Sequence, residues 1–282
     1  MTIFCGQMLV MKRTLPCLIQ SLTILAAFPF MSSSAQSLPA FDHVVVFGDS
    51  LSDNGNVGRA SNGPVWVEHL ASQFGLTIGP SRAGGTNFAM GGARLDPRSG
   101  NTSLREQASA YLQAPRPAGR TLHIVYGGGN DLLAAVGQRQ ARTAVDTAVA
   151  SLRSIVADLA SQGATDILVP NLPGIGITPA AQAQGSQAVE AANQLAARFN
   201  SALDEALSGF ANRTGLRLYR LDVWRLAERV RADPAAAGFV DVTSCCNQHR
   251  RCEGYLFWDD VHPTTQAHRR LAEAAAQLLE AP

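Results

Sequence analysis

Short apolar runs alternate along the chain with longer segments in which apolar residues recur at helical spacing. Runs at residues 44–47, 122–126 and 166–169 are rich in Val, Ile and Leu and indicate buried strands, and the alternating run 216–221 indicates another. Helical periodicity covers residues 64–74, 103–112, 139–162 and 188–213, and an alanine-rich helix is predicted after Thr264. Strands alternating with helices predict an α/β domain with a parallel sheet covered on both faces.

Polar and glycine residues follow two of these strands directly. The first strand ends at Gly48 and is followed by Ser50, while the second runs into Gly128, Gly129 and Asn130. Ligands of such sheets bind beyond the carboxyl ends of the strands. We therefore expect Ser50 and Asn130 to emerge at the same edge of the sheet.

The first 35 residues differ in pattern from the rest of the chain. Lys12 and Arg13 precede an apolar stretch at 15–31, and small residues follow up to Ala35. This order predicts a secretory signal peptide over residues 1–35, with Met11 as a candidate start. A retained membrane anchor is the alternative, which prolines within the stretch disfavour. Residues 36–282 are then expected to form one domain, exported to a periplasm or out of the cell.

Charge and glycine spacing exclude several function classes. With 23 Lys and Arg against 22 Asp and Glu, the net charge of +1 provides no electrostatic basis for binding nucleic acid. The glycine-rich stretches 84–93 and 127–131 lack the spacings that bind phosphate groups. We therefore expect neither a nucleic-acid partner nor a cofactor.

Export changes the interpretation of the cysteines that remain after the leader. In an oxidising compartment two of Cys245, Cys246 and Cys252 are expected to pair. Cys252 must be one partner if adjacent cysteines do not bridge, and the choice between Cys245 and Cys246 stays open. His249 lies close to the three thiols, so a zinc site is the alternative, which the compartment disfavours.

A serine hydroxyl needs a base and an orienting carboxylate before it can act as a nucleophile. His262 follows Asp259 by three residues and precedes Pro263, so one turn could present both side chains, although Asp259 could equally cap the turn. His123 lies within an apolar strand and is interpreted as a core residue. Backbone amides of glycine turns and an asparagine side chain are suitable donors for a developing oxyanion.

Four blocks of sequence carry a resemblance to a known family. They are Gly48-Asp49-Ser50-Leu51, residues 87–93, Gly128-Gly129-Asn130-Asp131, and residues 259–264. Together and in this order the blocks resemble the GDSL lipase/esterase family, also called SGNH hydrolases, and its secreted lipase-like branch in particular. The resemblance implies a three-layer α/β/α sandwich with a mainly parallel, flavodoxin-like sheet.

The resemblance also implies a role for each matching residue. Ser50 would be the nucleophile, His262 the general base and acid, and Asp259 rather than Asp260 the residue that orients His262. The oxyanion hole would comprise the Ser50 amide, the Gly91 amide and the Asn130 side chain, with Gly92 the one-residue alternative to Gly91. No cofactor or metal is implied.

The implied activity is hydrolysis of carboxylic esters, with lipid or phospholipid acyl esters foremost, through an acyl-enzyme intermediate. The partner is then a small-molecule or lipid ester, with room for transient contact with a lipid surface. A lipid acyltransferase or an acyl-sugar esterase could use the same residues. A non-catalytic binding module on the same fold is a further alternative. The sequence leaves acyl-chain length, head group and oligomeric state open.

Overall fold

The structure is a computed structural model that describes residues 41–99, 102–210, 215–247 and 251–280. The predicted signal peptide lies outside the described residues and remains a prediction. His249, which the sequence analysis considered as a zinc ligand, also lies outside them. Within the described ranges, no helix combines the length and apolar character needed to cross a membrane.

A parallel sheet forms the centre of the fold. Its strands pair in the order β1 (His43–Gly48), β2 (Thr121–Tyr126), β3 (Asp166–Pro170) and β4 (Arg217–Leu221). Residues 86–90 run along the outer edge of β1, where Asn87 bridges to Val46 and the Met90 amide donates to Gly48 O at 3.1 Å. With this segment counted as the second strand, the order is that of a flavodoxin-like sheet.

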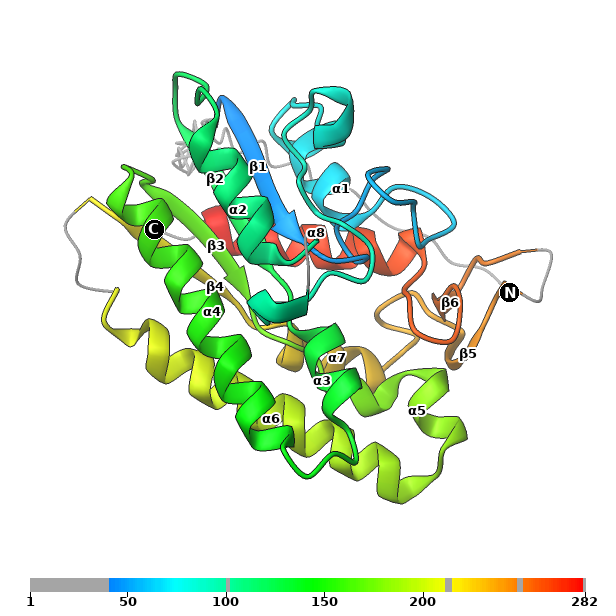
Figure 1. Cartoon of the computed structure of the whole chain (residues 1–282). Helices are drawn as coiled ribbons and strands as arrows, with labels where there is room; N and C mark the ends of the chain where they lie inside the picture. Colours follow the sequence, from blue (N-terminus) through cyan, green and yellow to red (C-terminus); the bar gives the residue numbers. More distant parts are fainter. Residues whose placement is uncertain (1–40, 100–101, 211–214, 248–250, 281–282) are drawn as a thin grey trace, which may run out of the picture. The chain divides into compact units, whose positions relative to one another are not determined.

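Helices cover both faces of the sheet, as Figure 1 shows. One face carries α1 (Trp66–Gln73) and α8 (Thr265–Glu280), and α7 (Val223–Ala232) packs against α8. The other face carries α2 (Leu104–Gln113), α3 (Gly129–Ala135), α4 (Ala141–Ser161) and α6 (Ser186–Ser208). The predicted three-layer α/β/α class is therefore confirmed.

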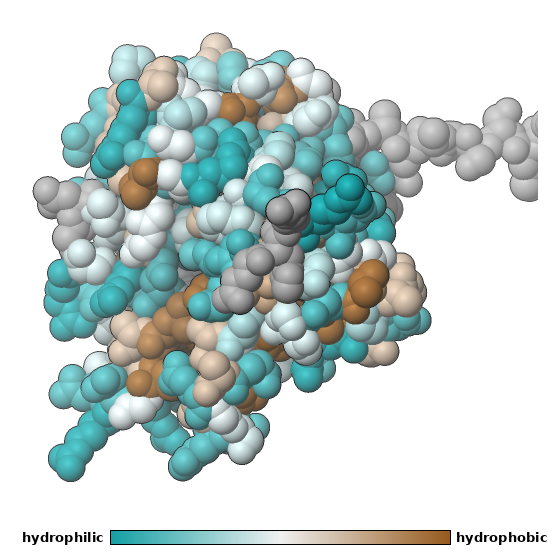
Figure 2. All heavy atoms as spheres, turned by 90° about the vertical axis from the view of Figure 1, so that its right-hand side faces the viewer, coloured by the Kyte–Doolittle hydropathy of each residue, from teal (hydrophilic) through white to brown (hydrophobic). Residues whose placement is uncertain are grey.

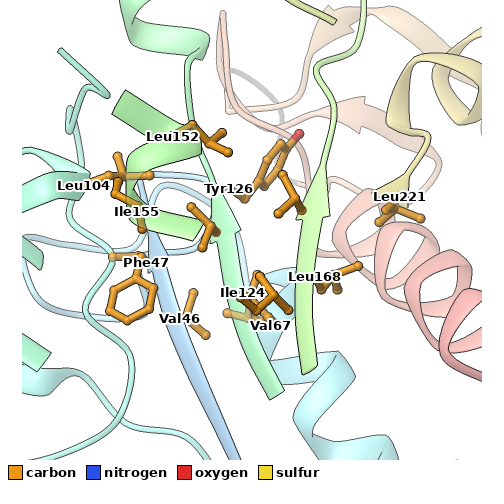
Figure 3. Packing of buried hydrophobic residues seen from close by; sticks show 14 of the residues in the cluster. Val46, Phe47, Val67, Leu104, Ile124, Tyr126, Leu152, Ile155, Leu168 and Leu221 are labelled. Atoms are coloured by element: carbon orange, nitrogen blue, oxygen red, sulfur yellow. The ribbon is translucent and has the colours of Figure 1, made fainter. Parts of the chain in front are cut away.

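Buried apolar side chains join the layers (Figure 3). Phe47, Ile124 and Leu168 project from the strands, Leu152 and Ile155 from α4, and all are fully buried. Successive side chains along each strand point alternately toward the two helical layers. Both faces of the sheet are therefore covered, which explains why these strands are apolar on both faces.

Several short elements lie in segments for which the sequence pattern predicts neither a helix nor a strand. They include α3, α7, the short helix α5 (Pro179–Ala183), and three 3₁₀ turns at Ser81–Ala83, Pro97–Ser99 and Ile175–Ile177. In addition β5 (Asp241–Cys245) and β6 (Tyr255–Phe257) pair in parallel as a separate small sheet. These elements are short or polar, so their apolar periodicity is too weak to be read locally.

A disulfide joins Cys246, just after β5, to Cys252, just before β6. Cys245 is free and partly buried, with its Sγ 3.4 Å from Asp260 Oδ1. The structure thus resolves the alternative that the sequence left open, in favour of Cys246. Because Cys246 and Cys252 form a disulfide, neither is available as a thiolate ligand, which argues against the zinc site considered as the alternative.

Candidate active site

A tight turn presents Ser50 at the carboxyl end of β1. The carbonyl of Asp49 accepts the amides of Ser52 and Asp53 at 3.0 Å each, and Asp49 Oδ1 accepts the Leu51 amide at 3.0 Å. Gly48 precedes the turn because a Cβ there would lie 2.9 Å from the Tyr126 carbonyl oxygen. The chain can therefore turn sharply beside β2 and leave the Ser50 side chain at the edge of the sheet.

A second turn, after β6, presents His262. Asp259 Oδ1 accepts the amides of Val261 at 2.9 Å and His262 at 2.6 Å, which closes the turn around the carboxylate. Asp259 Oδ2 lies 2.8 Å from His262 Nδ1. One side chain therefore both shapes the turn and holds the imidazole.

His262 Nε2 lies 2.9 Å from Ser50 Oγ. With the Nδ1–H donating to Asp259, the neutral ring carries its lone pair on Nε2 and can accept the Ser50 hydroxyl proton. Burial alone would raise the pKa of Asp259, but the amides of His262 and Val261 and the His262 ring hold it below its ordinary value. The carboxylate is therefore ionised and suited to stabilise an imidazolium.

Asp260 takes no part in this chain of hydrogen bonds. Its Oδ1 faces the Cys245 thiol, and its backbone carbonyl accepts the Ala180 amide at 2.9 Å. The structure therefore pairs His262 with Asp259 and separates it from Asp260.

The candidate oxyanion donors are the Asn130 side chain and the backbone amides of Ser50 and the glycine pair 91–92. Asn130 lies in the first turn of α3, donates one Nδ2 proton to Ala93 O at 2.9 Å, and keeps a second proton. Among the residues that the structure describes, the backbone amides of Ser50 and Gly92 have no hydrogen-bond partner. The Gly91 amide instead donates to Asp53 Oδ2 at 2.8 Å. The proton of the Gly91 amide is therefore already engaged in this bond.

Two buried carboxyl groups, those of Asp49 and Asp131, adjoin Ser50 and Asn130 in the chain. Burial raises the pKa of Asp49 to about 6, against the opposing effects of the Leu51 amide and His262. Burial also raises the pKa of Asp131, which accepts the amides of Leu95 and Asp96 at 2.9 Å each. Asp131 thereby joins the start of α3 to the loop that follows the glycine pair.

A cavity of about 170 Å³ adjoins Ser50, Asn130 and His262. It continues between α7, α8 and the loop at residues 172–178, and its lining is mainly apolar. On the face drawn in Figure 2, apolar residues gather in a band beside a hollow. The site can therefore accept an ester with an apolar part next to the serine.

The sequence predicts that Ser50, Asn130, Asp259 and His262 share one site. In the structure the first two and His262 line one cavity, and Asp259 contacts His262. Sequence reasoning missed Asp53 and the whole of α7. The run Ser52-Asp53-Asn54-Gly55-Asn56 carried a signal for Asp53, because Asp followed by Asn and Gly is typical of a side chain that accepts amides of its own turn. No group of three or more potential metal ligands occurs among the described residues.

The matching family model and the curated relatives identify the chain as a carboxylic ester hydrolase. The chain belongs to the GDSL-like lipase/acylhydrolase family, whose model matches residues 44–275. The family assignment suggested by the sequence blocks is therefore confirmed.

Two curated relatives illustrate the range of this similarity. The chain is 30% identical to a phosphatidylcholine-sterol acyltransferase of Aeromonas hydrophila, across 88% of this chain and 92% of that protein. It is 24% identical to Lipase 1 of Photorhabdus luminescens, across 89% of this chain but only 52% of that protein.

Solved structures share the fold at lower identity. A lipolytic G-D-S-L family protein from Veillonella parvula matches with a TM-score of 0.53 and 14% identity, over 83% of this chain and 96% of that one. The acetylxylan esterase Axe2 from Geobacillus stearothermophilus matches with a TM-score of 0.52 and 16% identity, over 86% and 96% of the two chains.

Proposed function

We propose that the protein is an exported serine esterase or lipase that uses Ser50, His262 and Asp259 as its catalytic triad. The observation that carries this proposal is the continuous chain of hydrogen bonds from Asp259 Oδ2 through the His262 ring to Ser50 Oγ, with distances of 2.8 and 2.9 Å. A nucleophile, a base within reach and a group that orients the base are the parts that acyl transfer requires.

The reaction proceeds in two acyl-transfer steps. Ser50 Oγ attacks the ester carbonyl carbon while His262 Nε2 takes the hydroxyl proton, which gives a tetrahedral intermediate. His262 then donates that proton to the leaving alcohol, and the acyl group remains on Ser50. A water molecule, deprotonated by His262, attacks the acyl carbon, and His262 returns the proton to Ser50.

The oxyanion is stabilised by the Ser50 amide, the second Nδ2 proton of Asn130 and the Gly92 amide. Gly92 replaces Gly91 in this role because the Gly91 amide already donates to Asp53. Removing one preorganised donor costs roughly 10²–10³-fold in rate. Asn130→Ala is therefore expected to lower kcat by about that factor.

The substrates are carboxylic esters, either acyl esters of lipids or esters of small alcohols. Transfer of the acyl group to an alcohol, rather than to water, is the second candidate function. It is supported by the 30% identity to a phosphatidylcholine-sterol acyltransferase. Product analysis with and without an added sterol or glycerol separates the two, because a transferase forms a new ester only when the acceptor is present.

Export is supported by the order of charged, apolar and small residues in the first 35 positions and by the disulfide. A chain that begins at Gln36 in the exported fraction is expected. A mature protein that retains residues 1–35 would contradict export with cleavage after Ala35.

Fluorophosphonate labelling tests the nucleophile directly. We expect one label, on Ser50, and loss of both the label and ester hydrolysis in Ser50→Ala, with an unchanged circular dichroism spectrum. Ser208→Ala, at the exposed end of α6, is the matched control and should keep both. An unlabelled wild-type protein would instead favour a binding module without catalysis.

A further inference from the structure

One face of α7 forms part of the wall of the cavity beside Ser50, together with α8 and the loop at residues 172–178. Val223, Leu226, Ala227 and Val230 recur at helical spacing and all line the cavity. Leu226 and Ala227 are only partly buried, although the strand and helix cores around them are closed. Part of this apolar face therefore borders empty space rather than protein.

The two halves of an ester place different demands on such a wall. The alcohol must depart before water can attack, whereas the acyl group stays on Ser50 through both steps. A recess that extends from Ser50 between two helices suits the group that stays. Burial against its apolar lining would favour an alkyl chain over a polar one.

Resting on the proposed function, we propose that this cavity is an acyl-chain pocket for about six carbons, with α7 as the wall that limits chain length. The cavity measures about 170 Å³. An apolar cavity of roughly 150 Å³ is known to hold benzene, a six-carbon molecule. The substrate class that fits is therefore an ester of a short to medium-length fatty acid.

Chain-length dependence follows from the size of the cavity. Each methylene that leaves water for an apolar wall gains about fourfold in kcat/KM. Carbons beyond the sixth find no further room in the cavity and contribute no such gain. We expect kcat/KM to rise from the acetyl to the hexanoyl ester and to stop rising by the octanoyl ester.

The first experiment compares 4-nitrophenyl esters of increasing acyl length, each below its micelle concentration, on the full mature protein. A rise that continues to the dodecanoyl ester, or a maximum at the acetyl ester, overturns the proposal. A parallel series of acetate esters varies the alcohol. A methylene gain confined to the alcohol series would mean that the cavity holds the leaving group, and this too overturns the proposal.

The second experiment narrows the cavity. Ala227→Leu adds three carbons on the wall, so we expect the ratio of hexanoyl to acetyl kcat/KM to fall about tenfold or more. Ala232→Leu makes the same change at the exposed end of α7, outside the cavity lining, and should leave the ratio as in the wild type.

The two proposals fail in different ways. Turnover of the acetyl ester and labelling of Ser50, without the chain-length pattern, overturn the acyl pocket and leave the proposed function standing. Absence of both turnover and label in the wild type overturns the two together. An equal drop in the ratio for Ala227→Leu and Ala232→Leu would overturn the assignment of α7 as the limiting wall.

Discussion

The Gly91 amide nitrogen lies 2.8 Å from Asp53 Oδ2, although 38 residues separate the two in the chain. The same carboxylate accepts the Val57 amide on Oδ2 at 3.0 Å, and the Gly55 and Asn56 amides on Oδ1 at 2.9 and 2.7 Å. Asp53 has no exposed surface. One buried side chain thus ties the turn after β1, which carries Ser50, to the glycine pair that we propose borders the oxyanion.

We predict that Asp53→Asn lowers both stability and kcat. The amide keeps one acceptor oxygen, so the amides that contact the other position meet an NH₂ group instead. Leaving buried amides unsatisfied costs about 1–3 kcal/mol each, so the free energy of unfolding should fall by about 2–4 kcal/mol. A shifted glycine turn should lower kcat about tenfold or more with less effect on KM. Urea unfolding and steady-state kinetics measure the two effects.

Asp241 provides the matched control. Its Oδ1 accepts the amides of both Thr243 and Ser244 at 2.8 Å each. The side-chain oxygen of Asn in Asp241→Asn can therefore accept the same two amides. This variant should unfold and turn over substrate like the wild type. If Asp53→Asn behaves in the same way, Asp53 does not position the glycine turn.

The roles of Asp259 and Asp260 can be separated by one pair of variants. Asp259→Asn removes the carboxylate that accepts the His262 Nδ1 proton and favours the wrong tautomer. A change of this kind in a serine protease lowers kcat about 10⁴-fold, and we expect a loss of 10³-fold or more. Asp260→Asn leaves the hydrogen-bond chain intact and should change kcat less than about threefold. Equal losses in the two variants, measured on one short-chain ester, would contradict the assignment.

The sequence was informative where the determining contacts are local. Strands and long helices such as α4 follow from periodicity, and Asp259 and His262 share one turn, so their spacing alone indicated a contact. By contrast, α7 carries four charged residues among ten, and its apolar stripe can be interpreted only from its packing against α8. Its position therefore depends on packing that no local pattern records.

Other features depend on contacts between distant segments. The choice between Cys245 and Cys246 was open because adjacent residues of an extended segment point to opposite sides, and only the surrounding fold decides which side is buried. Cys246 is fully buried and paired, whereas Cys245 is partly exposed. In the same way, the carboxylate that accepts the Gly91 amide belongs to Asp53, which lies 38 residues earlier in the chain, so no pattern around the glycine pair predicts this bond.

Asp166 is predicted to be a major source of stability far from the chemistry. It begins β3 at the edge of the sheet opposite Ser50, is fully buried, and binds Arg120 and Arg217 at 2.8 and 2.7 Å. Burial alone would raise its pKa, but the two guanidinium groups and Thr165 hold the pKa far below its ordinary value. Asp166→Asn should therefore lower the free energy of unfolding by about 3 kcal/mol and leave kcat unchanged.

An exposed ion pair serves as the comparison. Asp146 lies 2.8 Å from Arg198, with the two side chains 57% and 42% exposed. Asp146→Asn should cost less than about 1 kcal/mol, because water screens the pair. Thermal and urea unfolding of both variants measure the difference. Similar costs for Asp166→Asn and Asp146→Asn would show that the buried cluster is not a main source of stability.

The protein is expected to lose stability steeply as the pH falls, because it buries two neutral histidines. Burial lowers the pKa of His268 to about 3, with His69 and His262 contributing, and lowers that of His123 to about 4. An unfolded histidine titrates near 6.5, so below that pH the unfolded state binds protons that the folded state does not. Each histidine then lowers the free energy of unfolding by up to about 1.4 kcal/mol per pH unit, down to its folded pKa.

Asp49 acts in the opposite direction over part of this range. Its pKa is raised to about 6 by burial, so between pH 6 and about 4 the folded state holds a proton that the unfolded state releases. His268→Leu should therefore flatten the decline below pH 6.5, and Asp49→Asn should steepen it. Above pH 7, His268→Leu should be as stable as the wild type or more so, because neither ring nitrogen of His268 has a hydrogen-bond partner within the part of the chain that the structure describes. Urea unfolding at pH 5 and 7.5 measures both slopes, and an unchanged slope in His268→Leu would mean that this histidine is not the source of the acid sensitivity.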